Sequence, residues 1–118
     1  MTKNTKELHK QYTEYAAVLK KIRMCRLSLE FVKDSSDDEA VGFYECKLKD
    51  YEIERKKMMA EMMQDFELTM DEKLETILVL RYIKQLTWAE IGNVVGHEPH
   101  YVMRLRNQAL EKIVEMRN

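Results

Sequence analysis

Glycine, proline and cysteine are scarce in this chain of 118 residues, which contains 3 glycines, 1 proline and 2 cysteines. Sandwiches and barrels need many tight turns, and glycine and proline supply most of them, so these folds are excluded. Cys25 and Cys46 are too few and too far apart for a zinc ribbon or a CxxC redox motif. We expect both to pack as small apolar side chains on helix faces, and the alternative is a disulfide between them.

The chain also lacks a charge excess and a long apolar run. Its formal net charge is -1, with 35% charged and 45% hydrophobic residues, which is too apolar for a disordered chain. No uncharged segment is long enough to cross a bilayer, and the first residues do not resemble a signal peptide. These properties predict a soluble, cytoplasmic, almost entirely helical protein. The charge balance argues against a broad basic surface for nucleic acid.

Apolar residues in the first half recur in steps of four and three, which predicts two long helices that pack along a coiled-coil seam. A polar break over residues 34–39 separates them, with a serine expected as the N-cap of the second helix. The seam residues of the first helix, over 4–33, are Leu8, Tyr12, Tyr15, Leu19, Ile22 and Leu29. Those of the second are Val41, Tyr44, Leu48, Tyr51, Met58 and Met62.

The two seams match when the second helix folds back antiparallel on the first. In this register Leu8 faces Met62, and Ile22 faces Leu48. The sequence therefore predicts a long helical hairpin over residues 1–66. The alternative is that the two helices pair between subunits.

Each seam has one gap, and both gaps are arginines. In the antiparallel register Arg26 faces Tyr44 and Arg55 faces Tyr15, which are favourable cation–π pairs. Several apolar residues lie off the seam and need a partner in the C-terminal unit or in a second subunit, and we expect a homodimer through this half of the chain. They are Phe31, Val32, Phe43, Met59, Met63 and Phe66. The methionines near residue 60 are expected to fill a core where the hairpin meets the C-terminal region.

Capping signals predict three shorter helices in the remainder, residues 67–118. Thr69 and Thr87 each begin a capping box, with glutamate three residues later. Gly96 suits a left-handed residue at the end of the second of these helices. A last helix is expected over residues 99–116, because proline is favoured at a first helical position.

A short helix, a tight turn with glycine and a longer helix form the arrangement of a helix-turn-helix. Ile91 and Val95 supply the buried edge of its first helix, and Gly92 allows close approach of the second. Val102 and Leu105 would hold the second helix against the first. The whole chain is therefore expected to be all-α, with an N-terminal hairpin for oligomerisation and a C-terminal helix-turn-helix unit.

Residues 74–113 carry short motifs that point to a family. Leu80-Arg81-Tyr82 is followed by Leu86-Thr87-Trp88 and by Glu90-Ile91, and the pattern V-x-R-L-x-x-x-A-L-x-K runs over residues 102–112. This stretch resembles the fourth region of bacterial sigma factors. It is more closely similar to the sigma-like phage and prophage transcriptional regulators of the ArpU type.

The resemblance implies that the last helix enters the major groove of double-stranded DNA and reads base edges. Because Val102 and Leu105 face inward, the outward residues would be His100, Met103, Arg104 and Asn107. Arg104 suits a bidentate contact to guanine, and Asn107 one to adenine.

Other residues would hold the phosphate backbone. We expect Arg106, Gln108 and Lys84 to contact phosphates through their side chains. Thr87 and Trp88 lie at a helix N-terminus and would offer backbone amides to a phosphate. The main role expected of the Trp88 side chain is packing against Tyr82.

These features predict a dimeric, sequence-specific DNA-binding transcriptional regulator of phage or prophage type. One alternative is a sigma-like adaptor that binds RNA polymerase, which is supported by equal numbers of acidic and basic residues between Thr69 and Asn118. Another is a phage small terminase subunit, which also combines a helix-turn-helix with a coiled coil. We expect no enzyme, because the chain has no catalytic triad, phosphate-binding glycine loop or metal-ligand spacing. No cofactor or metal site is expected.

Overall fold

The computed structural model describes residues 1–117, and within this range all regular structure is helical. None of the helices in that range combines the length and apolar character needed to cross a membrane. In chain order the elements are α1 (Lys3–Asp34), α2 (Asp38–Glu67), α3 (Glu72–Leu78), the π-helical turn η1 (Val79–Ile83), α4 (Trp88–Val95) and α5 (Pro99–Arg117). The all-α prediction is confirmed.

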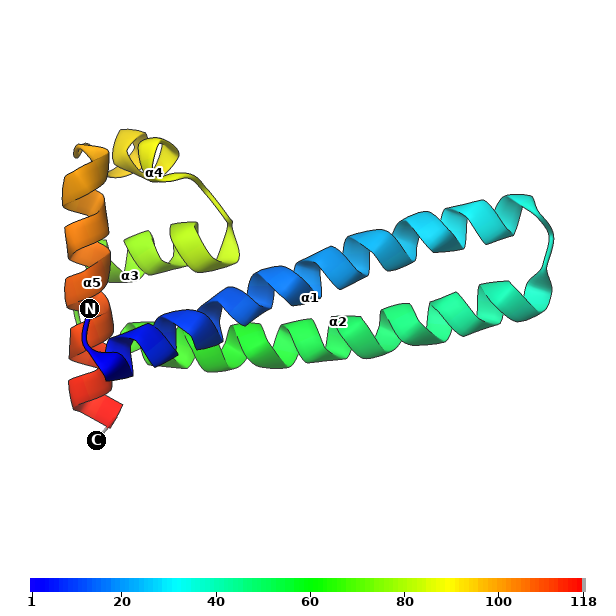
Figure 1. Ribbon diagram of the computed structural model, residues 1–118, viewed down its shortest axis with the longest axis horizontal. Coiled ribbons are helices and arrows are strands. Elements are labelled where there is room, and N and C mark those ends of the chain that lie inside the picture. The colour runs from blue at the N-terminus through cyan, green and yellow to red at the C-terminus, as the bar shows by residue number, and fades with distance from the viewer. Residues whose placement is uncertain (118) are drawn as a thin grey trace.

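α1 and α2 form the predicted hairpin, which projects from the C-terminal helices in a molecule 51 Å long (Figure 1). The register agrees with the prediction, since the Cys25 thiol donates to the Tyr44 carbonyl oxygen at 3.4 Å. Cys25 is buried in the seam one residue before the expected Arg26. Cys46 is exposed, so the expectation that both cysteines pack was wrong for Cys46.

The turn between the two helices differs from the prediction in its cap. The N-cap of α2 is Asp37, whose carboxylate accepts from the Ala40 backbone amide at 3.1 Å, and not a serine. A carboxylate at this position also interacts favourably with the positive end of the helix dipole. The preceding Ser36 takes a positive φ of 61° and reverses the chain.

The arginines of the seam are held by a carboxylate. Glu52 accepts from Arg26 at 2.8 Å and from Arg55 at 2.9 Å. The predicted stacking of Arg26 on Tyr44 was therefore wrong, because a charge-assisted hydrogen bond was within reach. Arg55 does meet Tyr15, and the hydrogen bonds that its guanidinium donates to Tyr15 and Glu52 raise its pKa.

The base of the hairpin and the C-terminal helices share one core. Tyr12 of α1 lies edge-on to Phe66 of α2, with ring centres 5.2 Å apart, and edge-on to Tyr82 of η1 at 5.3 Å. The Tyr12 hydroxyl donates to Asp65 at 2.8 Å. Figure 1 shows α5 crossing the open end of the hairpin, where Leu110 joins this core.

This core covers some of the apolar residues that lie off the predicted hairpin seam. Phe66 is fully buried, and Met59 and Met63 pack against the core, as expected for the methionine cluster. Phe31 and Phe43 lie near the far end of the hairpin and remain exposed. The C-terminal unit therefore accounts for the apolar residues at one end of the hairpin only.

The predicted capping box at Thr69 does not form. Asp71 is the N-cap of α3, and its carboxylate accepts from the Leu74 amide at 3.0 Å. Thr69 is buried, its hydroxyl donates to the Phe66 carbonyl at 2.9 Å, and its own carbonyl accepts from Lys112 at 2.9 Å. Thr69 thus ties α2 to α5, because burial requires its polar atoms to be paired.

Candidate nucleic-acid interface

The N-terminus of α4 is fixed by the capping box predicted at Thr87. The Thr87 hydroxyl accepts from the Glu90 amide at 3.2 Å, and the Glu90 carboxylate accepts from the Thr87 amide at 2.9 Å. These hydrogen bonds lower the pKa of Glu90. Thr87 is exposed, but the Glu90 carboxylate already occupies its amide, so the amide is not free for the phosphate that was expected there.

The turn after α4 depends on two glycines. Gly96 has a φ of +78°, the left-handed conformation that was predicted for it. The Gly92 carbonyl accepts from the amides of Gly96 at 2.8 Å and His97 at 3.0 Å. A Cβ on Gly92 would lie 2.5 Å from the His97 carbonyl oxygen, so the close approach expected at Gly92 is to the turn backbone.

α5 has a buried face and an exposed face. Val102 and Leu105 are buried, as predicted. The buried face continues through Ala109, Leu110 and Ile113. Of the four residues expected to face bases, His100 and Arg104 are exposed, and Met103 and Asn107 are half-buried.

The exposed face carries few ordered contacts. The Arg104 guanidinium lies 5.6 Å from the centre of the Tyr101 ring, which itself lies edge-on to His97 at 4.6 Å. Asn107 accepts a hydrogen bond from Arg106 through Oδ1 at 2.8 Å. This bond uses one of the two lone pairs of the amide oxygen.

Arg106 does not lie where the sequence analysis expected a phosphate-binding side chain. Only 6% of the residue is exposed, and one terminal nitrogen lies 3.2 Å from the Tyr82 hydroxyl and 3.4 Å from His9 Nδ1. The prediction failed because it weighed charge above helical spacing. Arg106 follows Val102 by four residues and precedes Ala109 by three, which places it on the inward face of α5.

His9, which sequence reasoning missed, connects α1 to this arginine. Its Nδ1 lies 2.7 Å from the Tyr82 hydroxyl. Arg106 can only donate and its terminal nitrogen lies 3.4 Å from Nδ1, so this geometry suits an Nδ1 that accepts, as in an imidazole protonated at Nε2. Burial, followed by the charges of Arg106 and Arg81, lowers the pKa of His9. Burial likewise raises the pKa of Tyr82.

Trp88 lies between two arginines. The Arg81 guanidinium is 4.1 Å from its ring centre and that of Arg106 is 4.8 Å away. The aromatic rings paired with Tyr82 are those of His9, Tyr12 and Phe66, so Trp88 packs against the core that contains Tyr82 without a ring-to-ring pair and makes these cation–π contacts.

Arg81 is a candidate phosphate ligand that the sequence analysis did not select. Half-buried, it donates to the Leu86 carbonyl at 3.0 Å and lies over Trp88, the first residue of α4. Lys84 and Gln108, both predicted backbone contacts, are exposed. No periodic signal places Arg81 here, because η1 and a short connection separate it from α4.

No known protein family matches the chain, and no curated protein or solved structure is significantly similar to it.

Proposed function

We propose that this protein is a sequence-specific DNA-binding transcriptional regulator of the phage or prophage type, in which α5 binds in the major groove of double-stranded DNA. The division of α5 into two faces carries the proposal. Its inner face is anchored by Val102 and Leu105, whereas His100 and Arg104 are exposed on the opposite face. A rigid helix that presents polar side chains away from its core is what major-groove readout requires.

The chemistry of the exposed residues supports base and backbone contacts. Arg104 offers two parallel donors to guanine, and Asn107 offers a donor and an acceptor to adenine. Arg81 and Lys84 would neutralise phosphates, and the Trp88 amide at the start of α4 would donate a hydrogen bond to one, which fixes the position of α5. Arg106 contributes by holding Trp88 and Asn107 in place.

A homodimer is part of the proposal, because one unit with balanced charge gains little electrostatic affinity for DNA. Leu27 and Phe31 lie one helical turn apart on α1, facing away from the seam, and are 59% and 75% exposed. Their contact across a two-fold axis would bring two α5 helices to one DNA site. A Leu27→Glu/Phe31→Ser variant should halve the mass measured by light scattering, and an unchanged mass would exclude this face.

Selection of bound sequences from a random pool of double-stranded DNA tests the proposal directly. The full chain should enrich a sequence with two related half-sites, and each half-site should contain an invariant guanine for Arg104. If the parent enriches no sequence beyond what the Arg104→Ala variant enriches from the same pool, the proposal is contradicted.

A sigma-like adaptor that binds RNA polymerase is the second candidate. The exposed acids Glu98 and Glu111 lie at the start of α5 and on its outer face, where they would repel phosphates. Capture of purified RNA polymerase by the full chain without DNA, together with no enriched DNA sequence, would favour this function. A mass of about ten subunits would instead favour the DNA-packaging role of a small terminase subunit.

A further inference from the structure

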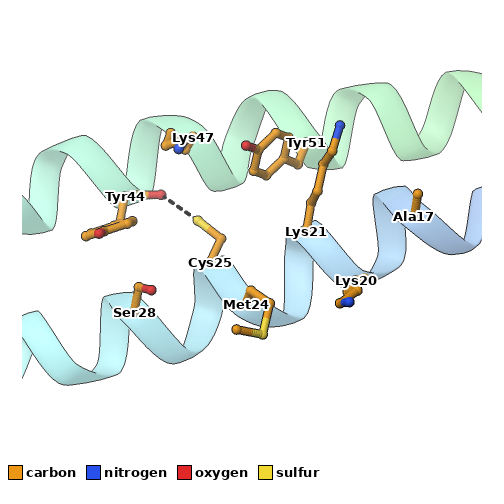
Figure 2. A pocket seen from close by; sticks show the side chains of 9 residues that line it. All are labelled: Ala17, Lys20, Lys21, Met24, Cys25, Ser28, Tyr44, Lys47 and Tyr51. Carbon is orange, nitrogen blue, oxygen red and sulfur yellow. Dashed lines mark hydrogen bonds between the residues drawn. The ribbon is translucent and has the colours of Figure 1, made fainter.

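A groove with a volume of about 460 Å³ runs along one face of the hairpin between α1 and α2 (Figure 2). Met24 and Cys25 line it from α1, and Tyr44 and Tyr51 line it from α2. Met24 is 55% exposed, and both tyrosines are only half-buried. Two helices alone cannot cover both sides of their seam, so this apolar surface remains accessible to a third element.

The rims of the groove are positively charged. Lys20 and Lys21 of α1 and Lys47 of α2 lie along it, and none of the described residues that line it is acidic. Figure 2 shows Lys21 extending over the Tyr51 ring, with its ammonium 5.7 Å from the ring centre. Among residues 1–117, none of the salt bridges uses these three lysines.

Arg26 and Arg55 of the hairpin differ from these lysines. Away from the groove lining, Glu52 bridges Arg26 and Arg55, so the charges of these three residues are paired with one another. The contrast indicates that the lysine-rimmed groove is suited to an anionic partner, whereas Arg26 and Arg55 already have one in Glu52.

We propose that this groove binds an acidic amphipathic helix of a partner protein, which completes a three-helix bundle with α1 and α2. The groove extends from Ala17 to Ser28 on α1, about 16 Å at the rise of an α-helix, or roughly three turns. Apolar residues of the partner at i, i+4 and i+7 would cover Tyr44 and Tyr51, and its flanking acids would pair with the lysines.

A second copy of this chain is a poorer occupant. A two-fold dimer brings the same patch of each subunit together, which would place one lysine-rimmed groove against another and concentrate positive charge in the interface. Nucleic acid is also disfavoured, because Met24 and Cys25 leave part of the groove without a polar group for a sugar-phosphate chain. The proposal does not depend on DNA binding, since these residues lie outside α4 and α5.

A display selection with the labelled full-length protein tests the proposal. The library contains helical peptides of about 16 residues with fixed leucines at i, i+4 and i+7, and with alanine, glutamate, glutamine or lysine elsewhere. We expect enriched peptides with a clear excess of glutamate over lysine. A synthetic peptide from this pool should bind a Lys21→Glu/Lys47→Glu variant at least about tenfold more weakly than the parent.

Lys49→Glu/Lys56→Glu is the matched control, because it makes the same charge change at exposed positions of α2 outside the groove. This control should bind the peptide within about twofold of the parent, and both variants should retain the parent's helical circular dichroism and DNA affinity. Equal weakening by both variants, or no glutamate enrichment, would overturn the proposal. A changed oligomeric mass of the Lys21→Glu/Lys47→Glu variant would overturn it in favour of a second copy of the chain. Displacement of the labelled peptide by single-stranded DNA at a lower concentration than by unlabelled peptide would overturn it in favour of nucleic acid.

Discussion

Arg106 of α5 donates a hydrogen bond of 3.2 Å to the hydroxyl of Tyr82 in η1, inside the protein. Among residues 1–117, none of its hydrogen-bond partners is a carboxylate, and its charge is met by the Trp88 ring and neutral polar atoms. A buried cation is costly unless such groups surround it. The contact fixes the last helix relative to η1 and, through His9, to the hairpin.

Replacement of this arginine should test its structural role. Arg106→Ala removes the partner of Tyr82 and leaves a cavity beside Trp88, so we expect the free energy of unfolding to fall by about 2–4 kcal/mol. Arg104→Ala is the control, because Arg104 is exposed and its loss should change stability by less than about 0.5 kcal/mol. Urea denaturation followed by circular dichroism measures both. Equal stability of the two variants would show that Arg106 does not support the fold.

The same exposed arginine gives the prediction for DNA. Arg104→Ala should weaken binding to the selected sequence by about 1–3 kcal/mol and relax the preference at one base pair. Arg81→Ala or Lys84→Ala should instead weaken all sequences alike and reduce the salt slope of binding by about one unit. Titrations at several salt concentrations separate these effects. If Arg104→Ala binds every sequence with the parent's preferences, α5 does not read bases.

The stability of the fold should depend on the protonation of His9. Its pKa is lowered in the folded protein, so below about pH 6.5 the unfolded chain binds more protons than the folded one. The stabilisation is complete above that pH, and it is lost as the pH falls toward the lowered folded-state pKa. Urea unfolding at pH 7.5 and 5.5 should therefore show a smaller decrease for His9→Gln than for the parent. An identical decrease would mean that the imidazole does not contribute.

Two glycines should respond to alanine in opposite directions. Gly92→Ala brings a Cβ within 2.5 Å of a backbone oxygen, so it should destabilise the fold by about 1–3 kcal/mol. Gly42 lies in α2 with no atom near its added Cβ, and Gly42→Ala should stabilise the fold by about 0.5–1 kcal/mol. Thermal unfolding of both variants gives the comparison. A stable Gly92→Ala protein would mean that the turn before α5 is able to move aside.

Local and periodic signals in the sequence predicted the helices and their pairing. The four-three spacing gave the hairpin and its register, because each seam residue must meet one in the other helix. The capping box at Thr87, the left-handed Gly96 and the first-position Pro99 were all correct, since each depends on backbone groups within a few residues. The inward positions Val102 and Leu105 followed from the same spacing.

The tertiary structure decided the contacts for which a side chain has several possible partners far away in the sequence. Arg26 pairs with Glu52 and not with Tyr44 as predicted, and the N-cap of α2 is Asp37 and not a serine. Arg106 was predicted to bind phosphate, but it is buried and holds helices together inside the protein, because its position on α5 faces the core. The sequence by itself determined which residues share a helix face. The packing of α1, η1 and α5 determined which charges are buried, because that depends on atoms far apart in the chain.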